Sequence, residues 1–251
     1  MKRFATLGLA VMFMLGAGAA AQAELMGELG ILDVSGNNPA TEEPWQAGDP
    51  YRLFFLTSAN TTAESSDIAT YDAFVQGLAN ASTAYNMSPA TWRVFGTTPD
   101  VDVADHNQIH FTESSPGDPV YQLDGATLVA KDFETLIYTL PNVQPLLTDA
   151  GDSVGGTTPW TGSTRTEYPD VQTYKYDQPG KALGDAEGIT TWGNQGFTYS
   201  ARGWYAYWRA DQTNEKPLYA MSEELNIVPE PATLALLGLG GLATLIRRRR
   251  R

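Results

Sequence analysis

The pattern of apolar and polar positions is most regular between residues 51 and 78. Tyr51–Ser58 is a short run of mostly apolar and aromatic side chains, which predicts a strand. The segment after it predicts a helix, and Ser65, Ser66 or Asp67 can cap its amino end. The apolar side chains that recur there at steps of three and four residues, and so form a buried stripe, are Ile68, Tyr71, Phe74, Val75 and Leu78.

Further along the chain, short apolar segments alternate with turn residues, as is typical of strands. Pro119–Leu123 predicts a strand that returns through the turn Asp124-Gly125 into Thr127–Ala130 as a hairpin. Phe133–Leu140 is apolar and its length suits either a helix or a strand. The other predicted strands are Gly27–Val34, Thr91–Phe95, a strand pair within Phe197–Trp208, and Pro217–Ser222 as the closing strand.

Residues 148–190 are rich in Gly, Asp, Thr, Pro and Tyr, and they lack periodicity. This predicts a long loop region that contains Trp160–Ser163. Together with one or two early helices and short strands, it indicates a single compact α+β domain over residues 24–227. The chain has no cysteine, which excludes disulfides, thiolate zinc sites and cysteine nucleophiles. About 200 residues are enough to fold around an apolar core without such links.

The charge of this central region is strongly negative. The whole chain has a formal charge of −13, but residues 24–228 carry 28 acidic and only 9 basic side chains. Such a field repels phosphate backbones, so nucleic acid is not an expected partner. It favours solubility and suits cations or neutral sugars better than anionic lipid. A solvated acidic surface explains the same composition without any ligand.

The amino end has the three parts of a secretory signal peptide, which we place at residues 1–23. Lys2 and Arg3 provide the positive charge, and Leu7–Leu15 forms a short apolar stretch. Ala21 and Ala23 form the small-x-small site at which signal peptidase cleaves. The mature chain is therefore expected to begin at Glu24 and to be exported.

The carboxyl end, residues 228–251, has a different order of features. Pro229-Glu230-Pro231 is followed by the apolar run Ala232–Ile246 and then by five arginines. The run is fifteen residues long, against about 20 for an ordinary membrane span. Counting from Pro231 and letting the first arginine extend to the interface brings it close to that length. The arginines would hold that end in the cytoplasm.

This order closely resembles the PEP-CTERM sorting signal. The resemblance implies transient anchoring in the inner membrane, then recognition and cleavage near Pro229, Glu230 and Pro231 by an exosortase-type membrane transpeptidase. It also implies Gram-negative bacteria that make exopolysaccharide or biofilm. The alternative is a tail anchor that is not cleaved.

A second resemblance concerns the domain between the two ends. In order along residues 50–225, Arg52–Ser58 with the helix after it, Val120–Gly125, Trp160–Ser163 and Leu218–Ser222 resemble the endostatin branch of C-type-lectin-like folds. The resemblance implies a C-type-lectin-like (endostatin-like) arrangement with a binding or matrix role and no catalysis. The absence of cysteine departs from that family, whose members are usually disulfide-bonded.

Two groups of residues are candidates for metal binding. Asp100, Asp102 and Asp105 alternate with valines beside a turn and could supply hard oxygen ligands to calcium. A half-exposed strand explains the same alternation, and the EF-hand spacing is absent. His106 and His110 are four residues apart, as on a zinc-binding helix, but the Glu of a metalloprotease helix is missing. The surrounding sequence also favours a strand, in which the two rings lie far apart.

The remaining candidates favour binding over catalysis. A Gly-x-Ser-x-Gly serine hydrolase motif is absent, and the many carboxylates make no pair informative for glycoside hydrolysis. The aromatic side chains Trp160, Trp192, Trp204, Tyr205, Tyr207 and Trp208 could stack on sugars or could all be core. As a strand, residues 204–208 would place Trp204, Ala206 and Trp208 on one side and both tyrosines on the other.

These observations lead to one expectation and two alternatives. We expect a non-enzymatic protein of the cell surface or extracellular matrix that needs no cofactor and binds exopolysaccharide. One alternative is an exported polysaccharide hydrolase, and the other is a structural surface protein without a ligand.

Overall fold

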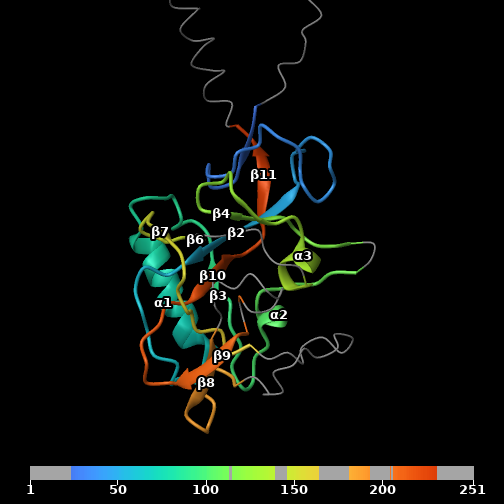
Figure 1. Cartoon of the computed structure of the whole chain (residues 1–251). Coiled ribbons are helices and arrows are strands. Elements are labelled where there is room, and N and C mark those ends of the chain that lie inside the picture. Colours follow the sequence, from blue (N-terminus) through green and yellow to red (C-terminus); the bar gives the residue numbers. More distant parts are fainter. Residues whose placement is uncertain are drawn as a thin grey trace, which may run out of the picture. The chain divides into compact units, whose positions relative to one another are not determined.

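The computed structural model describes residues 24–112, 115–138, 146–163, 181–192, 204 and 206–230. One compact unit spans Leu25–Pro229, and it is a mixed α+β fold with few helices, as the sequence predicts (Figure 1). Its helices are α1 (Ile68–Ala81), α2 (Val103–His106) and α3 (Phe133–Tyr138). Its strands are β1 (Leu25–Gly27), β2 (Pro50–Leu56), β3 (Trp92–Val94), β4 (Val120–Gln122), β5 (Leu128–Ala130), β6 (Leu146–Leu147), β7 (Ser153–Val154), β8 (Ile189–Trp192), β9 (Trp208–Asp211), β10 (Tyr219–Ser222) and β11 (Leu225–Pro229).

The main sheet has seven strands and contains both the first strand of the domain, β1, and its last, β11. Its central path runs β1-β11-β2-β10-β3, and β4 and β5 extend it from β2. Only the β2–β4 pair is parallel, with Leu53 opposite Tyr121, and the other pairs of this sheet are antiparallel. Two smaller two-stranded sheets, β6–β7 and β8–β9, lie off this sheet.

Strand β2 is the centre of the core because both of its faces are covered. Leu53 and Phe55 belong to a core cluster on one face, and Phe54 and Leu56 belong to a second cluster on the other. All four side chains are at most 1% exposed. This two-sided burial explains why the segment is a continuous apolar run and not an alternating one.

Helix α1 covers the first face of the sheet and confirms the predicted amphipathic pattern. The carboxylate of Asp67 accepts the N–H of Ala69 at 3.0 Å and caps the helix. Of the predicted stripe Tyr71 and Val75 are fully buried, together with Ala79, whereas Ile68, Phe74 and Leu78 are only partly buried. Side chains of α2 and α3 belong to the second cluster, so helices lie on both faces (Figure 1).

Arg52 is the one charged side chain of β2, and it is 2% exposed. Its Nε atom lies 3.1 Å from a carboxylate oxygen of Asp118, and its Nη1 donates to the carbonyls of Asn107 and Ser222. The guanidinium also lies 5.5 Å from the ring centre of Phe133. A buried cation is tolerated here because its donors have partners.

Several elements predicted from sequence are confirmed, including the strand at 50–56, the 91–95 strand and the hairpin at 119–130. Phe133–Tyr138, which suited either type, is a helix. The Gly27–Val34 strand is wrong: β1 ends at Gly27, and a turn with positive φ at Gly30 follows it. Ser222 does not close the fold either, because β11 follows β10.

Candidate functional site

The β8–β9 pair gathers aromatic side chains at one edge of the domain. Trp192 and Trp208 are direct partners in its antiparallel register, so both side chains lie on the same face. The Tyr207 ring is 5.3 Å from the Trp192 ring at a tilt of 56°. We call these three residues, Trp192, Tyr207 and Trp208, the aromatic platform.

The platform is exposed to an unusual degree for such large apolar side chains. Trp208 is 56% exposed and Tyr207 is 37% exposed, and within the described residues they are the exposed large hydrophobic side chains. Trp160 and Trp204 are buried instead, at 0% and 5% exposure. Exposed aromatic faces next to polar groups are typical of binding sites rather than of core packing.

This outcome corrects the strand expected over residues 204–208. Trp204 lies in the second core cluster, where its ring is 5.4 Å from that of Phe95, and β9 begins only at Trp208. Trp204 and Trp208 therefore do not share one face of a strand. Tyr205 and most of the predicted Phe197–Trp208 strand pair lie outside the described residues.

Lys216 contacts one ring of the platform, that of Trp192, and the buried Trp160. Its ammonium lies 4.9 Å from the ring centre of Trp192 and 5.3 Å from that of Trp160, and it donates to Thr158 Oγ1 at 2.8 Å. Burial lowers the pKa of Lys216. The faces of the two indoles oppose this shift because they stabilise the charged ammonium.

Polar groups lie before β8 and at the end of β9, and Asp211 is opposite Ile189 at the other end of the ladder from Trp192 and Trp208. Lys181 lies 2.7 Å from Glu187, and this hydrogen bond raises the pKa of the lysine. Asp211 accepts from both the hydroxyl and the backbone N–H of Thr213, which lowers its pKa. Exposed ring faces can stack on the C–H face of a sugar, and carboxylate and hydroxyl groups elsewhere on the same strand pair can bind its hydroxyls.

The predicted calcium residues do not converge on one point. Asp102 is the N-cap of α2 and accepts from Ala104 N at 2.7 Å, whereas Asp100 is exposed before the helix and Asp105 lies within it. The strand considered for this segment is thus a short helix. In the described ranges, no group of three or more Asp, Glu, His or Cys side chains is arranged to hold a metal ion.

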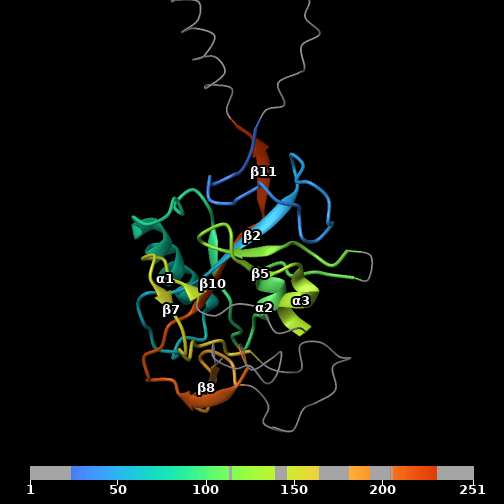
Figure 2. The same ribbon diagram turned by 45° about the horizontal axis from the view of Figure 1, so that its top comes forward.

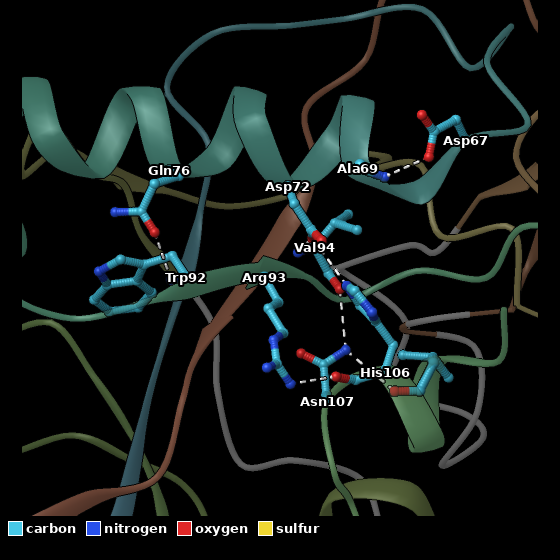
Figure 3. A network of polar contacts seen from close by, with 10 residues as sticks. Asp67, Ala69, Asp72, Gln76, Trp92, Arg93, Val94, His106 and Asn107 are labelled. Carbon is cyan, nitrogen blue, oxygen red and sulfur yellow. Dashed lines mark hydrogen bonds and ion pairs between the residues drawn. The ribbon is translucent and has the colours of Figure 1, made fainter.

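The two histidines considered for zinc also have different surroundings. His106 ends α2, and its Nε2 atom lies 2.9 Å from Asp72 Oδ1 on α1 (Figure 3). His110 lies beyond the helix and is exposed. The strand favoured for this segment is therefore also absent, and His106 joins two helices across β3.

The same network protects an edge of the main sheet. Within the described residues β3 pairs only with β10, which leaves the N–H groups on its outer edge without a strand partner. Side chains of α1 take this place: Gln76 Oε1 accepts from Trp92 N at 2.8 Å, and Asp72 Oδ1 accepts from Val94 N at 2.9 Å (Figure 3). An edge covered in this way cannot recruit another strand.

Two of the predicted processing residues, Pro229 and Glu230, lie in the described part of the chain. Pro229 is the last residue of β11 and lies opposite Leu25, the first residue of β1. The N–H of Glu230 donates to the carbonyl of Glu24 at 2.6 Å. Ala21, Ala23, Pro231 and the apolar run Ala232–Ile246 lie outside the described residues. In the part that the structure describes, no helix is long and apolar enough to cross a membrane.

Comparison with known proteins bears on the carboxyl end alone. No curated protein matches the chain in sequence. Residues 228–251 match the family model of the PEP-CTERM protein-sorting motif, as predicted from Pro229-Glu230-Pro231 and the arginine cluster. The chain thus carries a motif that indicates export and exosortase-dependent sorting to the cell envelope.

Proposed function

We propose that this chain is a non-enzymatic protein of the cell surface or extracellular matrix that binds exopolysaccharide through the aromatic platform. The observation that carries the proposal is the exposure of Trp208 and Tyr207 beside Trp192. An exposed indole places apolar surface in water, and a ligand that binds over this surface explains why it is there. The acidic composition favours a neutral sugar chain over an anionic one.

The position of the platform supports this role in a sorted protein. Figures 1 and 2 show β8 and β11 at opposite ends of the Leu25–Pro229 unit. The sorting motif starts within β11. A protein handled by the envelope machinery at one end therefore presents its aromatic side chains at the other.

The proposal includes neither catalysis nor a metal. Asp211 accepts from Thr213 and Glu187 is paired with Lys181, and the sequence offers no motif that assigns the two carboxylates an acid and a base role. Asp102 caps a helix. The C-type-lectin-like arrangement is part of the proposal too, supported by the mixed α+β fold with its short strand pairs and long loops.

The test is a binding titration of the Glu24–Pro229 chain with exopolysaccharide purified from the host, in calcium and in chelator. We expect saturable binding that is equal in both conditions. Trp208→Ala should weaken binding at least about tenfold, as buried tryptophan contacts at interfaces commonly do. Trp208→Phe, which keeps a ring, should retain most of the affinity.

The control is Tyr85→Ala, which removes a half-buried aromatic side chain after α1. It should bind like the unmodified chain. Binding that is lost equally in Tyr85→Ala and Trp208→Ala would contradict a role for the platform. Sugar chains that shorten during the titration would indicate the hydrolase, and absence of binding by a folded domain would indicate a structural protein.

A further inference from the structure

The sorting motif begins inside the folded domain and not in a linker after it. The family match starts at Val228, and β11 extends to Pro229. Leu25, Met26 and Gly27 of β1 pair in antiparallel register with Pro229, Val228 and Ile227. We call these six residues, Leu25–Gly27 with Ile227–Pro229, the terminal ladder.

Strand β11 is held on both sides, which makes the terminal ladder part of the sheet. On the β2 side, Leu225 lies opposite Tyr51, and the N–H of Ile227 donates to the carbonyl of Asp49 at 3.0 Å. On the β1 side, the N–H of Glu28 donates to the carbonyl of Asn226 at 3.0 Å. Ile227 is 1% exposed, so β11 is also anchored by its side chain.

Close packing beneath β1 sets how well the terminal ladder forms. A Cβ atom added at Gly27 would lie 2.6 Å from Tyr51 Oη and 2.8 Å from Leu32 Cβ. Tyr51 is itself fully buried, which leaves its ring little room to move. Glycine at position 27 therefore allows β1 to approach β11 and the core closely.

We propose that β1 controls access of the exosortase-type enzyme to the sorting motif: the motif is cleaved only when the terminal ladder opens. An enzyme that cleaves a peptide bond must surround the chain on both sides of that bond. Val228 and Pro229, which begin the motif, are held by β1 on one side. The enzyme thus competes with Leu25–Gly27 for the same stretch of backbone.

The energetics of strand ends make this control adjustable. Terminal strands open locally at much lower free energy than the whole domain. When opening and closing are faster than cleavage, the cleavage rate follows the population of the open form. Hydrogen-bonded positions alternate from Glu28–Asn226, so Leu25–Pro229 is a non-hydrogen-bonded pair, and the bonds that must break lie at Met26–Val228 and between the N–H of Glu230 and the carbonyl of Glu24.

The first test locks the terminal ladder. Glu28 and Asn226 form a hydrogen-bonded pair of the ladder. Hydrogen-bonded pairs recur at every second position, so Met26 and Val228 form the next such pair. The Cα atoms of such a pair are about 5.5 Å apart, which is within the range of a disulfide. The chain has no cysteine, so the double variant M26C/V228C can form only this bridge. Full-length chain is expressed in the host, and tail removal is followed by intact mass in a pulse-chase.

We expect the oxidised double variant to lose its tail at least about tenfold more slowly than the unmodified chain, because a bridged ladder rarely opens. Reductant should restore the rate, and each single cysteine variant should be processed normally. Normal processing of the oxidised double variant would overturn the proposal. Slow processing of V228C alone would show that Val228 is recognised as a side chain and would equally contradict control by β1.

The second test loosens the terminal ladder. Gly27→Ala should speed tail removal several-fold by weakening the docking of β1. Gly36→Ala is the matched control, because a Cβ there would meet nothing within 4 Å. A thermal scan of both variants shows whether the domain remains folded. Equal processing of two folded variants would oppose the proposal, and neither test involves the glycan-binding role.

Discussion

The two ends of the domain hold their shape by different means. At the β1–β11 end, backbone pairing places Pro229 opposite Leu25, and Tyr51 and Ile227 pack beside the paired strands. At the β8–β9 end, tryptophans dominate: Trp160 is buried, and Trp208 is more than half exposed. Backbone pairing keeps the terminal strands in register, whereas side-chain packing leaves one aromatic surface uncovered. The sorting motif begins at the first end, and the proposed glycan binding lies at the second.

The largest expected effect is a difference in unfolding free energy between two tryptophan variants at the β8–β9 end. Trp160→Ala should lower the free energy of unfolding by about 3–5 kcal/mol, because the buried indole leaves a cavity. Trp208→Ala should change it by less than about 0.5 kcal/mol, because more than half of that side chain is exposed. Urea denaturation of both variants measures this difference, and equal losses would mean that the platform is part of the core.

The β1–β11 end should be the more sensitive to alkaline pH. Burial raises the pKa of Tyr51, beneath Gly27, to about 12. The folded chain then holds a proton that the unfolded chain releases near pH 10, so stability is complete below pH 10 and falls as pH rises toward 12. The loss for this tyrosine reaches about 3 kcal/mol.

This loss is measured by urea denaturation between pH 9 and pH 12, with tyrosinate absorbance as the readout of ionisation. Tyr51→Phe should show a shallower loss over the same interval, although Tyr71 and Tyr121, whose pKa values burial also raises to about 12, keep part of the slope. An identical slope in Tyr51→Phe would mean that Tyr51 ionises without strain in the folded chain.

The smallest effect concerns the covered sheet edge between the two ends. Gln76→Ala leaves the N–H of Trp92 without its acceptor, and this should cost about 1–3 kcal/mol. Gln46→Ala, which removes an exposed glutamine near Trp45, is the control and should be close to neutral. Denaturant midpoints compare the two, and similar values would show that water replaces Gln76 at no cost.

Prediction from sequence was most reliable for elements whose hydrophobic pattern is set by burial within the segment itself. The apolar run of β2 and the three-and-four-residue spacing of α1 reflect burial within each segment, so both were predicted. The sorting motif was also predicted, because its parts are contiguous. Strand β11 was not predicted, because the sequence pattern indicated Pro217–Ser222 as the closing strand.

The candidate site was harder to predict because it depends on contacts between distant segments. The aromatic residues themselves were identified, but alternation could not show that Trp204 turns into the second core cluster while Trp208 stays exposed. Lys216 was missed since nothing near it in the sequence points to Trp160 or Trp192. Asp72 likewise meets His106 only in the folded chain.

The place of β11 in the sheet order has a mechanical consequence. A chain retained in the envelope through its carboxyl end would transmit any pull on a bound polymer along β11. That strand lies between β1 and β2 and is not at an edge. A load along an interior strand is shared by the hydrogen bonds on both of its sides, whereas an edge strand has such bonds on one side only. The strand that leads into the tail is thus the one best placed to bear tension.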